Sequence, residues 1–248
     1  MSGGKAAGLL ALSEVTAVPR FVVIGPECPL DPPTLFTMCD RAGVQEPLAV
    51  RSSADVEDGN GAAFAGMFDT RLGVARAELA SAIAAVRGSV NSARVRSYAS
   101  ARRLPVQTNM NVIVQNMVDS RVAGVCATRL PEMEQDAITI ESVWGLGESL
   151  VSGAATPDVS YVDRATRRIE RGAVGNQLVE LRLGQGKTLV SPHLRSVAKL
   201  TDDELTAITD VALAVERKLG WPAVDLEWAF DDDQLWALQA RPVTSVSA

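Results

Sequence analysis

The chain has 248 residues, a formal net charge of −6, 47% hydrophobic residues and 22% charged residues. This length and composition are those of a globular protein with one large domain or two smaller ones, which excludes a disordered chain. The net acidity argues against a nucleic-acid binder held by phosphate contacts. We find no apolar run of about 18 residues and no basic-then-apolar leader, so we expect a soluble, cytoplasmic protein without a membrane span or signal peptide.

The cysteine and histidine content narrows the chemistry further. Cys28, Cys39 and Cys126 are odd in number and widely spaced, which favours reduced thiols over a disulfide framework or a zinc site. The single histidine, His193, excludes metal centres that need two or three imidazole ligands.

The first half of the chain predicts alternating helices and strands. We expect a helix over 6–12, a strand over 21–24, a short helix over 33–42 and a strand over 48–51, followed by a polar, glycine-containing loop to about residue 66. Residues 76–103 are Ala-rich with apolar side chains at helical spacing, so we expect one long amphipathic helix there. The residues of that apolar pattern are Leu79, Ile83, Val86 and Val90.

The second half is rich in predicted strands. Short β-favouring runs predict strands over 112–115, 124–128, 138–142, 161–163 and 178–183. A helix begins after Thr201, whose hydroxyl forms a capping box with Glu204, and it ends at Gly220. A hairpin of strands 225–230 and 235–241 follows. We therefore expect an α+β protein whose second half is mostly antiparallel, with no linker-like stretch dividing the chain.

The last hairpin has the most informative polar pattern. Side chains two positions apart share one face of a strand, so Asp225 and Glu227 point away from the large apolar residues between them. By the same alternation Gln239 and Arg241 share a face, and we expect Trp236 on the opposite one.

A loop of three residues, 232–234, would place Glu227 opposite Gln239 and Asp225 opposite Arg241. Two carboxylates, an amide oxygen and a guanidinium group then meet on one patch. Hard oxygen ligands of this kind suit Mg²⁺ shared with phosphates, and arginine suits the phosphates themselves. The alternative is a solvated hairpin face with ordinary ion pairs.

Three glycine-containing segments could handle an anion. Segment 51–66 follows a strand that ends in Arg51, and its small hydroxyl and glycine residues let backbone N–H groups approach an oxyanion. Gly3-Gly4-Lys5 at a helix start offers the same chemistry with a lysine charge. Neither matches the Walker pattern G-x-x-x-x-G-K-[ST]. Residues 144–148 form a third glycine-rich corner, and taken singly each segment is more often a turn or a cap.

Segment 51–70, RSSADVEDGNGAAFAGMFDT, resembles the RSSA-x-x-ED…FAG-x-x-DT signature of one ATP-binding domain. Phosphoenolpyruvate synthase, pyruvate phosphate dikinase and rifampicin phosphotransferase share this domain. Five further segments fall in the order of that family's motifs, namely 3–9, 112–118, 141–158, 200–205 and 225–244. The resemblance covers nearly the whole chain.

The resemblance implies an ATP-grasp fold, in which the nucleotide lies between two α+β lobes. We place these lobes at 1–105 and 106–248, the first being shortened. By similarity the phosphates would be lined by Lys5, Arg51, Gly66 and Thr70. The adenine would face a hinge that includes Gln115, Met117 and Val118.

The same resemblance gives the hairpin residues their roles. Glu227 and Gln239 would hold Mg²⁺, and Arg241 would contact a phosphate. Asp225 and Glu141 would support these ligands or contact the ribose. The catalytic set implied by the family is Arg51, Arg241 and Glu227.

The chain also departs from the family's pattern. The family carries a phospho-accepting histidine on a separate swivelling domain, whereas His193 lies in a different context, and we expect it to be a surface or loop residue. A helical insert and a strand before Gly3-Gly4-Lys5 are reduced or absent, which leaves the order of the Lys5 loop in question.

Three functions are compatible with these residues. The first is an ATP-dependent phosphotransferase that acts on a small-molecule acceptor or on a histidine domain of a separate polypeptide. The second is an ATP-grasp ligase that forms an acyl phosphate, and the third is a non-catalytic nucleotide-binding subunit. We expect ATP and Mg²⁺ as ligands, and neither nucleic acid nor a membrane as a partner.

Overall fold

A computed structural model describes residues 4–53, 69–93, 95–97, 110–130 and 136–243. The chain forms two compact units, one from Met1–Gly8 with Pro19–Met117 and one from Leu9–Val18 with Val118–Ala248. The expected boundary between residues 105 and 106 lies outside the described residues. The units divide after Met117 instead, because strand β4 (Asn111–Asn116) is an internal strand of the first unit's sheet.

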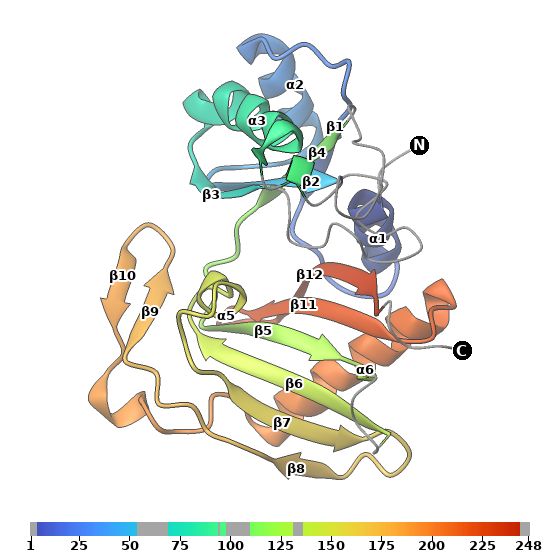
Figure 1. Ribbon diagram of the computed structural model, residues 1–248, viewed down its shortest axis with the longest axis vertical. Helices are drawn as coiled ribbons and strands as arrows, with labels where there is room; N and C mark the ends of the chain where they lie inside the picture. Colours follow the sequence, from blue (N-terminus) through green and yellow to red (C-terminus); the bar gives the residue numbers. More distant parts are fainter. Residues whose placement is uncertain (1–3, 54–68, 94, 98–109, 131–135, 244–248) are drawn as a thin grey trace. The chain divides into compact units, whose positions relative to one another are not determined.

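The first unit is an antiparallel sheet covered by helices. Its strands, in the order β1-β4-β2-β3, are β1 (Phe21–Ile24), β4, β2 (Leu48–Ser53) and β3 (Thr70–Val74). Helices α2 (Pro32–Ala42) and α3 (Leu79–Gly88) lie beside this sheet (Figure 1). Side chains of both helices and of the sheet form one core, which includes Leu35, Val50, Ile83, Val86, Val112 and Val114.

The prediction of one long helix over 76–103 is wrong. The segment forms a 3₁₀ turn, η1 (Arg76–Glu78), then α3, then a second 3₁₀ turn, η2 (Ser89–Asn91), with helical residues resuming at 93. Ser92 is extended, with a ψ of 150°, and its Oγ accepts the backbone N–H of Val95 at 3.3 Å. This serine therefore interrupts one helix and caps the next. Residues 98–103 lie outside the described part.

The second unit is built on a six-stranded antiparallel sheet of order β12-β11-β5-β6-β7-β8. The strands are β5 (Val122–Ala127), β6 (Ala137–Trp144), β7 (Asp158–Asp163), β8 (Ile169–Arg171), β11 (Val224–Phe230) and β12 (Leu235–Pro242). Helix α6 (Asp202–Leu219) runs along one face of this sheet (Figure 1). Its capping box at Thr201 and Glu204 and its left-handed Gly220 end are as expected from the sequence.

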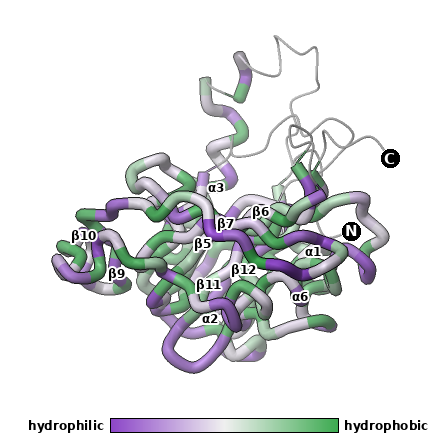
Figure 2. Tube along the Cα trace, turned by 90° about the horizontal axis from the view of Figure 1, so that it is seen from below, coloured by the Kyte–Doolittle hydropathy of each residue, from purple (hydrophilic) through white to green (hydrophobic). Residues whose placement is uncertain are grey.

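The remaining elements of the second unit are short. They are α5 (Glu148–Val151), the hairpin β9 (Val179–Arg182) and β10 (Gly186–Leu189), and the 3₁₀ turn η3 (Pro192–Leu194). The β9–β10 hairpin carries both hydrophobic and hydrophilic residues (Figure 2). Helix α1 (Gly4–Ser13) contributes residues to both units.

The core of the second unit lies between α6 and the sheet. It includes Ile140, Leu205, Ile208, Leu226 and the fully buried Trp228. A Cβ on Gly124 would lie 1.9 Å from the carbonyl oxygen of Glu141 and 2.6 Å from Cζ2 of Trp228. Only glycine therefore lets β5 and the indole ring approach so closely.

Within the described ranges, no helix combines the length and the apolar character needed to cross a membrane.

Candidate functional site

The β11–β12 hairpin brings together the acidic, amide and basic residues predicted from its sequence. Glu227 lies directly opposite Gln239, and Asp225 lies directly opposite Arg241. The pairing is therefore as expected, but it arises differently. Phe230 pairs with Leu235, so the loop has the four residues Asp231–Gln234 and not the three residues 232–234 that the predicted pairing assumed. A bulge at position 238 then shifts the register by one residue and restores both pairs.

The same bulge overturns the expected position of Trp236. Ala229 pairs with Trp236 on the loop side of the bulge, so Trp236 shares its face with Glu227 and not with the core residues. Its neighbour Ala237 is fully buried in the core cluster. Trp236 Nε1 donates to Asp231 Oδ2 at 2.6 Å. An extra residue in one strand inverts the alternation, and no sequence signal marked it.

Glu141 on β6 lies on the same face of the sheet as Glu227. Glu227 pairs with Val125 of β5, and Val125 pairs with Glu141 of β6. Residues directly opposite share a face, so Glu141 and Glu227 lie in one row across the sheet. The flanking residues Leu226 and Ile140 belong to the core on the other face, beneath α6. The row that contains Glu141, Glu227 and Gln239 is therefore on the face opposite α6.

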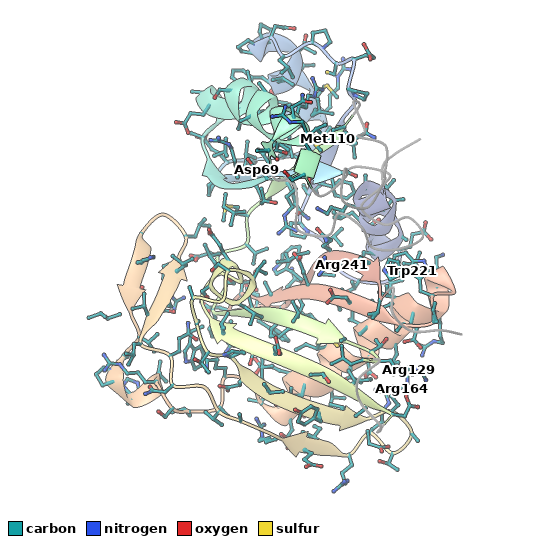
Figure 3. The ribbon with its side chains drawn as sticks, viewed as in Figure 1. Asp69, Met110, Arg129, Arg164, Trp221 and Arg241 are labelled. Carbon is teal, nitrogen blue, oxygen red and sulfur yellow. The ribbon has the colours of Figure 1, made fainter. Side chains whose placement is uncertain are left out.

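Arg241 forms an ion pair with Asp225, in the row next to the one that contains Glu227 and Gln239. Its Nε donates to Asp225 Oδ2 at 2.7 Å, with the two side chains 35% and 21% exposed. Figure 3 shows Arg241 on β12. Gln239 is nearly buried, at 5% exposure. Asp225 thus fixes the direction of the Arg241 guanidinium on a half-exposed face.

The described residues contain no group of three or more His, Cys, Asp or Glu side chains placed to hold a metal. Glu227 and Gln239 instead offer one carboxylate and one amide oxygen from paired positions. This donor set fits Mg²⁺, which takes few protein oxygens and completes its shell with water and substrate phosphates.

The first unit places other expected residues together. Arg51 on β2 lies directly opposite Thr70 on β3 and opposite Ile113 on β4. Gln115 pairs with Ala49, two residues along from Arg51, and so shares its face. Val50 and Val114 between them belong to the core. Arg51, Thr70 and Gln115 therefore lie on the face of this sheet that points away from its core.

Gln115 is buried on that face, at 1% exposure. Its Nε2 has no hydrogen-bond acceptor among the described residues. A buried amide donor without a partner is costly, so this position is suited to a ligand that accepts a hydrogen bond.

Lys5 lies beside the end of β2. Its Nζ donates to Ser52 Oγ at 3.4 Å, and the backbone N–H of Ala6 donates to Ser53 Oγ at 3.1 Å. The serines thus tie the start of α1 to the strand that carries Arg51. These bonds fix Lys5 beside the end of β2, although the sequence left the order of its loop in question. Gly66 lies outside the described residues.

The expected hinge is tied to its neighbours through Met117. The N–H of Met117 donates to the carbonyl of Pro47 at 3.1 Å, and its Sδ accepts the N–H of Gly73 at 2.9 Å. The N–H of this residue is therefore already used. Val118 begins the second unit's main segment.

The glycine-rich corner at 144–148 is a structural turn. The N–H of Gly145 donates to Arg121 O at 2.9 Å, and that of Leu146 donates to Leu181 O at 2.8 Å. Gly145 has a φ of +76°, and a Cβ there would lie 2.3 Å from Leu181 O. The glycine is thus required by the fold, and the N–H groups of Trp144, Gly145 and Leu146 are all used within the protein.

His193 is exposed in η3, as the sequence predicted for a surface residue. Its Nδ1 shares a hydrogen bond with Ser191 Oγ at 3.1 Å.

Comparison with curated proteins gives relatives that this chain matches over most of its length. It is 34% identical over 246 residues to a probable phosphoenolpyruvate synthase of Methanothermobacter thermautotrophicus, covering 95% of this chain and 36% of that protein. It is 36% identical over 214 residues to the prodigiosin synthesizing transferase PigC of Serratia marcescens, covering 84% of this chain and 24% of that protein. The chain thus spans about a third or less of the length of these relatives.

Among solved structures, a D-alanine–D-alanine ligase of Helicobacter pylori aligns with 96% of this chain and 53% of its own, at 6% identity and a TM-score of 0.48. The model of the family described as pyruvate phosphate dikinase, AMP/ATP-binding domain, matches residues 34–248. The α+β class and the ATP-grasp fold that the resemblance implied agree with this match. This chain belongs to the pyruvate phosphate dikinase AMP/ATP-binding domain family.

Proposed function

We propose that this chain binds Mg-ATP and transfers a phosphoryl group to a small-molecule acceptor or to a histidine domain on a separate polypeptide. The observation that carries the proposal is the pairing of Glu227 with Gln239 next to the Asp225–Arg241 ion pair. Ordinary surface ion pairs would not require a buried glutamine opposite a carboxylate. This arrangement supplies oxygen ligands and a fixed cation at adjacent positions.

In this proposal Glu227 and Gln239 hold Mg²⁺ through their side-chain oxygens. The ion, when bound, neutralises charge on the phosphates. Arg241 contacts a phosphate oxygen, and Asp225 keeps its guanidinium in place through the 2.7 Å bond to Nε. Glu141 lies in the same row and faces the ribose or supports the metal ligands. Its separation from Glu227 by one intervening strand suits an indirect contact.

The family resemblance also assigns phosphate-binding residues to the first unit, taken by itself. Arg51 and Lys5 bind phosphate oxygens, and Thr70 and Gly66 line the same group. Support comes from the Arg51–Thr70 pairing and from the Lys5–Ser52 contact. Phosphoryl transfer needs the protein mainly to position groups and to neutralise charge. Arginine and lysine side chains are chemically suited to that task.

We place the adenine along the strand end that includes Gln115, Met117 and Val118. The unpartnered Nε2 of Gln115 is available to a ring nitrogen or carbonyl-type acceptor. Because the N–H of Met117 is bonded to Pro47, the hinge recognises the base through other backbone groups or through its carbonyl.

The acceptor is assigned only by class. Two relatives are named as a probable phosphoenolpyruvate synthase and a transferase. A third is named as the uncharacterized phosphotransferase YvkC of Bacillus subtilis, which is 33% identical over 204 residues, with 80% of this chain and 24% of that protein aligned. We propose that this chain supplies the ATP-binding step of such a reaction. In this proposal His193, which is exposed beside Ser191, takes no part in the phosphoryl transfer.

The test is a product assay. The protein is incubated with Mg-ATP and candidate acceptors, and the nucleotides are separated. AMP as the product supports dikinase chemistry, in which two phosphoryl groups leave the nucleotide, and ADP with a phosphorylated acceptor supports a simple kinase. Absence of Mg-dependent ATP binding by calorimetry would contradict the proposal. ADP with an acyl phosphate consumed by an amine would favour a ligase instead.

A further inference from the structure

The carboxyl end of β6 lacks a strand partner on its β7 side. The β6–β7 pairing stops at Ser142 opposite Asp158, whereas β6 continues to Trp144. Buried backbone groups at such a strand end need other hydrogen-bond partners. Glu141 pairs with Val159, one position before the pairing stops.

The side chain of Gln177 takes the place of the missing strand. Its Oε1 accepts the N–H of Trp144 at 2.8 Å, and its Nε2 donates to the carbonyl of Trp144 at 3.0 Å and to that of Val179 at 3.1 Å. Gln177 is 2% exposed. One amide group therefore satisfies both backbone groups of Trp144, as an antiparallel strand would.

A buried ion pair fixes the segment that carries Gln177. Lys199 Nζ donates to Asp158 Oδ1 at 2.5 Å and to Gly175 O at 3.2 Å, and its side chain has no exposed surface. Asp158 also accepts the N–H of Gly175 at 2.8 Å and that of Lys199 at 2.9 Å. Three separate parts of the chain thus meet at one carboxylate.

Burying the charges of Asp158 and Lys199 is costly, which indicates that this ion pair does more than stabilise the fold. An ion pair removed from water is often no more stabilising than well-packed apolar residues, and the best-supported use of such pairs is to fix one arrangement. Here the arrangement fixed is the last part of β6. Asp158 is adjacent in register to the Glu141–Val159 pair.

We propose that Asp158, Lys199 and Gln177, the β6 brace, are positioning residues for nucleotide binding that act through Glu141. This inference rests on the proposed function, because it assigns the brace to the Mg-ATP site. The brace holds the strand end so that the Glu141 carboxylate stays in the row with Glu227. No residue of the brace contacts the nucleotide itself.

A double-mutant cycle tests the inference. Gln177→Met removes the three amide bonds and leaves the Asp158–Lys199 pair intact. The double variant Asp158→Leu/Lys199→Met removes both charges, so that neither is left buried alone. Each is made in the native background and in Glu141→Gln, and the Kd for Mg-ATP is measured by calorimetry on protein shown to be folded by circular dichroism.

The control removes a partly buried ion pair of the same unit, Arg164–Glu216. Arg164 makes two bonds with Glu216, at 2.7 and 3.2 Å, and donates to Thr128 O at the end of β5. The double variant Arg164→Met/Glu216→Leu should leave the Kd for Mg-ATP within about twofold in both backgrounds.

We expect each brace variant to weaken Mg-ATP binding about tenfold in the native background and less than twofold in Glu141→Gln, because coupled residues are non-additive. Equal effects in the two backgrounds, or no effect in either, would overturn the inference. If the native chain binds no Mg-ATP, the proposed function fails. If the native chain binds Mg-ATP but the effects of the variants are additive, only the present inference fails.

Discussion

Glu227 and Gln239 lie directly opposite each other on β11 and β12, one residue from a bulge that sets their register. Without the bulge, the four-residue loop would place Glu227 opposite Leu238, and the amide oxygen would turn to the other face. The candidate metal pair therefore depends on one extra residue in β12. This dependence connects the loop length of a hairpin to the chemistry of its face.

Replacing Glu227 should remove the proposed metal site. We expect Glu227→Ala to lower Mg-dependent turnover of ATP by at least about 100-fold, since a carboxylate ligand and its charge are lost. Turnover and Mg²⁺ titrations measure the effect. Asp232→Ala is the control, because Asp232 is an exposed acid in the loop of the same hairpin. Full activity of Glu227→Ala would refute the assignment.

Asp225 should matter through Arg241. Asp225→Asn keeps a hydrogen-bond acceptor but removes the charge that faces Arg241 Nε at 2.7 Å, so we expect kcat to fall about tenfold, which is less than in Arg241→Ala. Because the two act as one unit, the double variant should be no worse than Arg241→Ala alone. Effects that simply multiply would show that Asp225 has a separate role.

His193 should be dispensable. It is exposed, and its ring shares a hydrogen bond with the nearby Ser191. We expect His193→Ala to change kcat by less than about twofold and the free energy of unfolding by less than about 0.5 kcal/mol. Kinetic assays and chemical denaturation check both. An inactive, folded variant would make His193 a phosphoryl carrier and would contradict the need for an external acceptor.

Asp231 should make the hairpin's stability depend on pH. Burial alone would raise the pKa of Asp231, but hydrogen bonds from Trp236 Nε1 and from the N–H groups of Gln234 and Asp233 outweigh it, and the pKa lies below its ordinary value. A carboxyl group whose pKa is lowered on folding stabilises the protein at pH values above the unfolded-state pKa, which is about 3.9. This stabilisation is lost as the pH falls through the pKa of the folded state.

The Asp231 effect is measured by thermal unfolding. The Tm difference between the native chain and Asp231→Asn should be largest above about pH 5 and should shrink as the pH falls below about 4. Trp236→Phe removes the indole donor and should reduce this pH dependence. A Tm difference that grows on acidification would reverse the sign and contradict the assigned cause.

The sequence alone predicted most of the local elements and which polar residues of the last hairpin share a face. Alternation placed Asp225 with Glu227, and the capping box fixed the start of α6 at Thr201. These features depend on residues close together in the chain, whose periodicity and hydrogen bonding can be read directly. The ordered motifs also identified the family, which the match over 34–248 shows.

Only the tertiary structure decided the features that depend on distant segments. The bulge that turns Trp236 toward the face of Glu227, and the row that brings Glu141 to that face, result from register across several strands. The partners of Asp158 come from Gly175 and Lys199, far along the chain. Strand register and buried pairing are set by how the whole sheet excludes water, so a local pattern does not specify the bulge or the partners that come from distant strands.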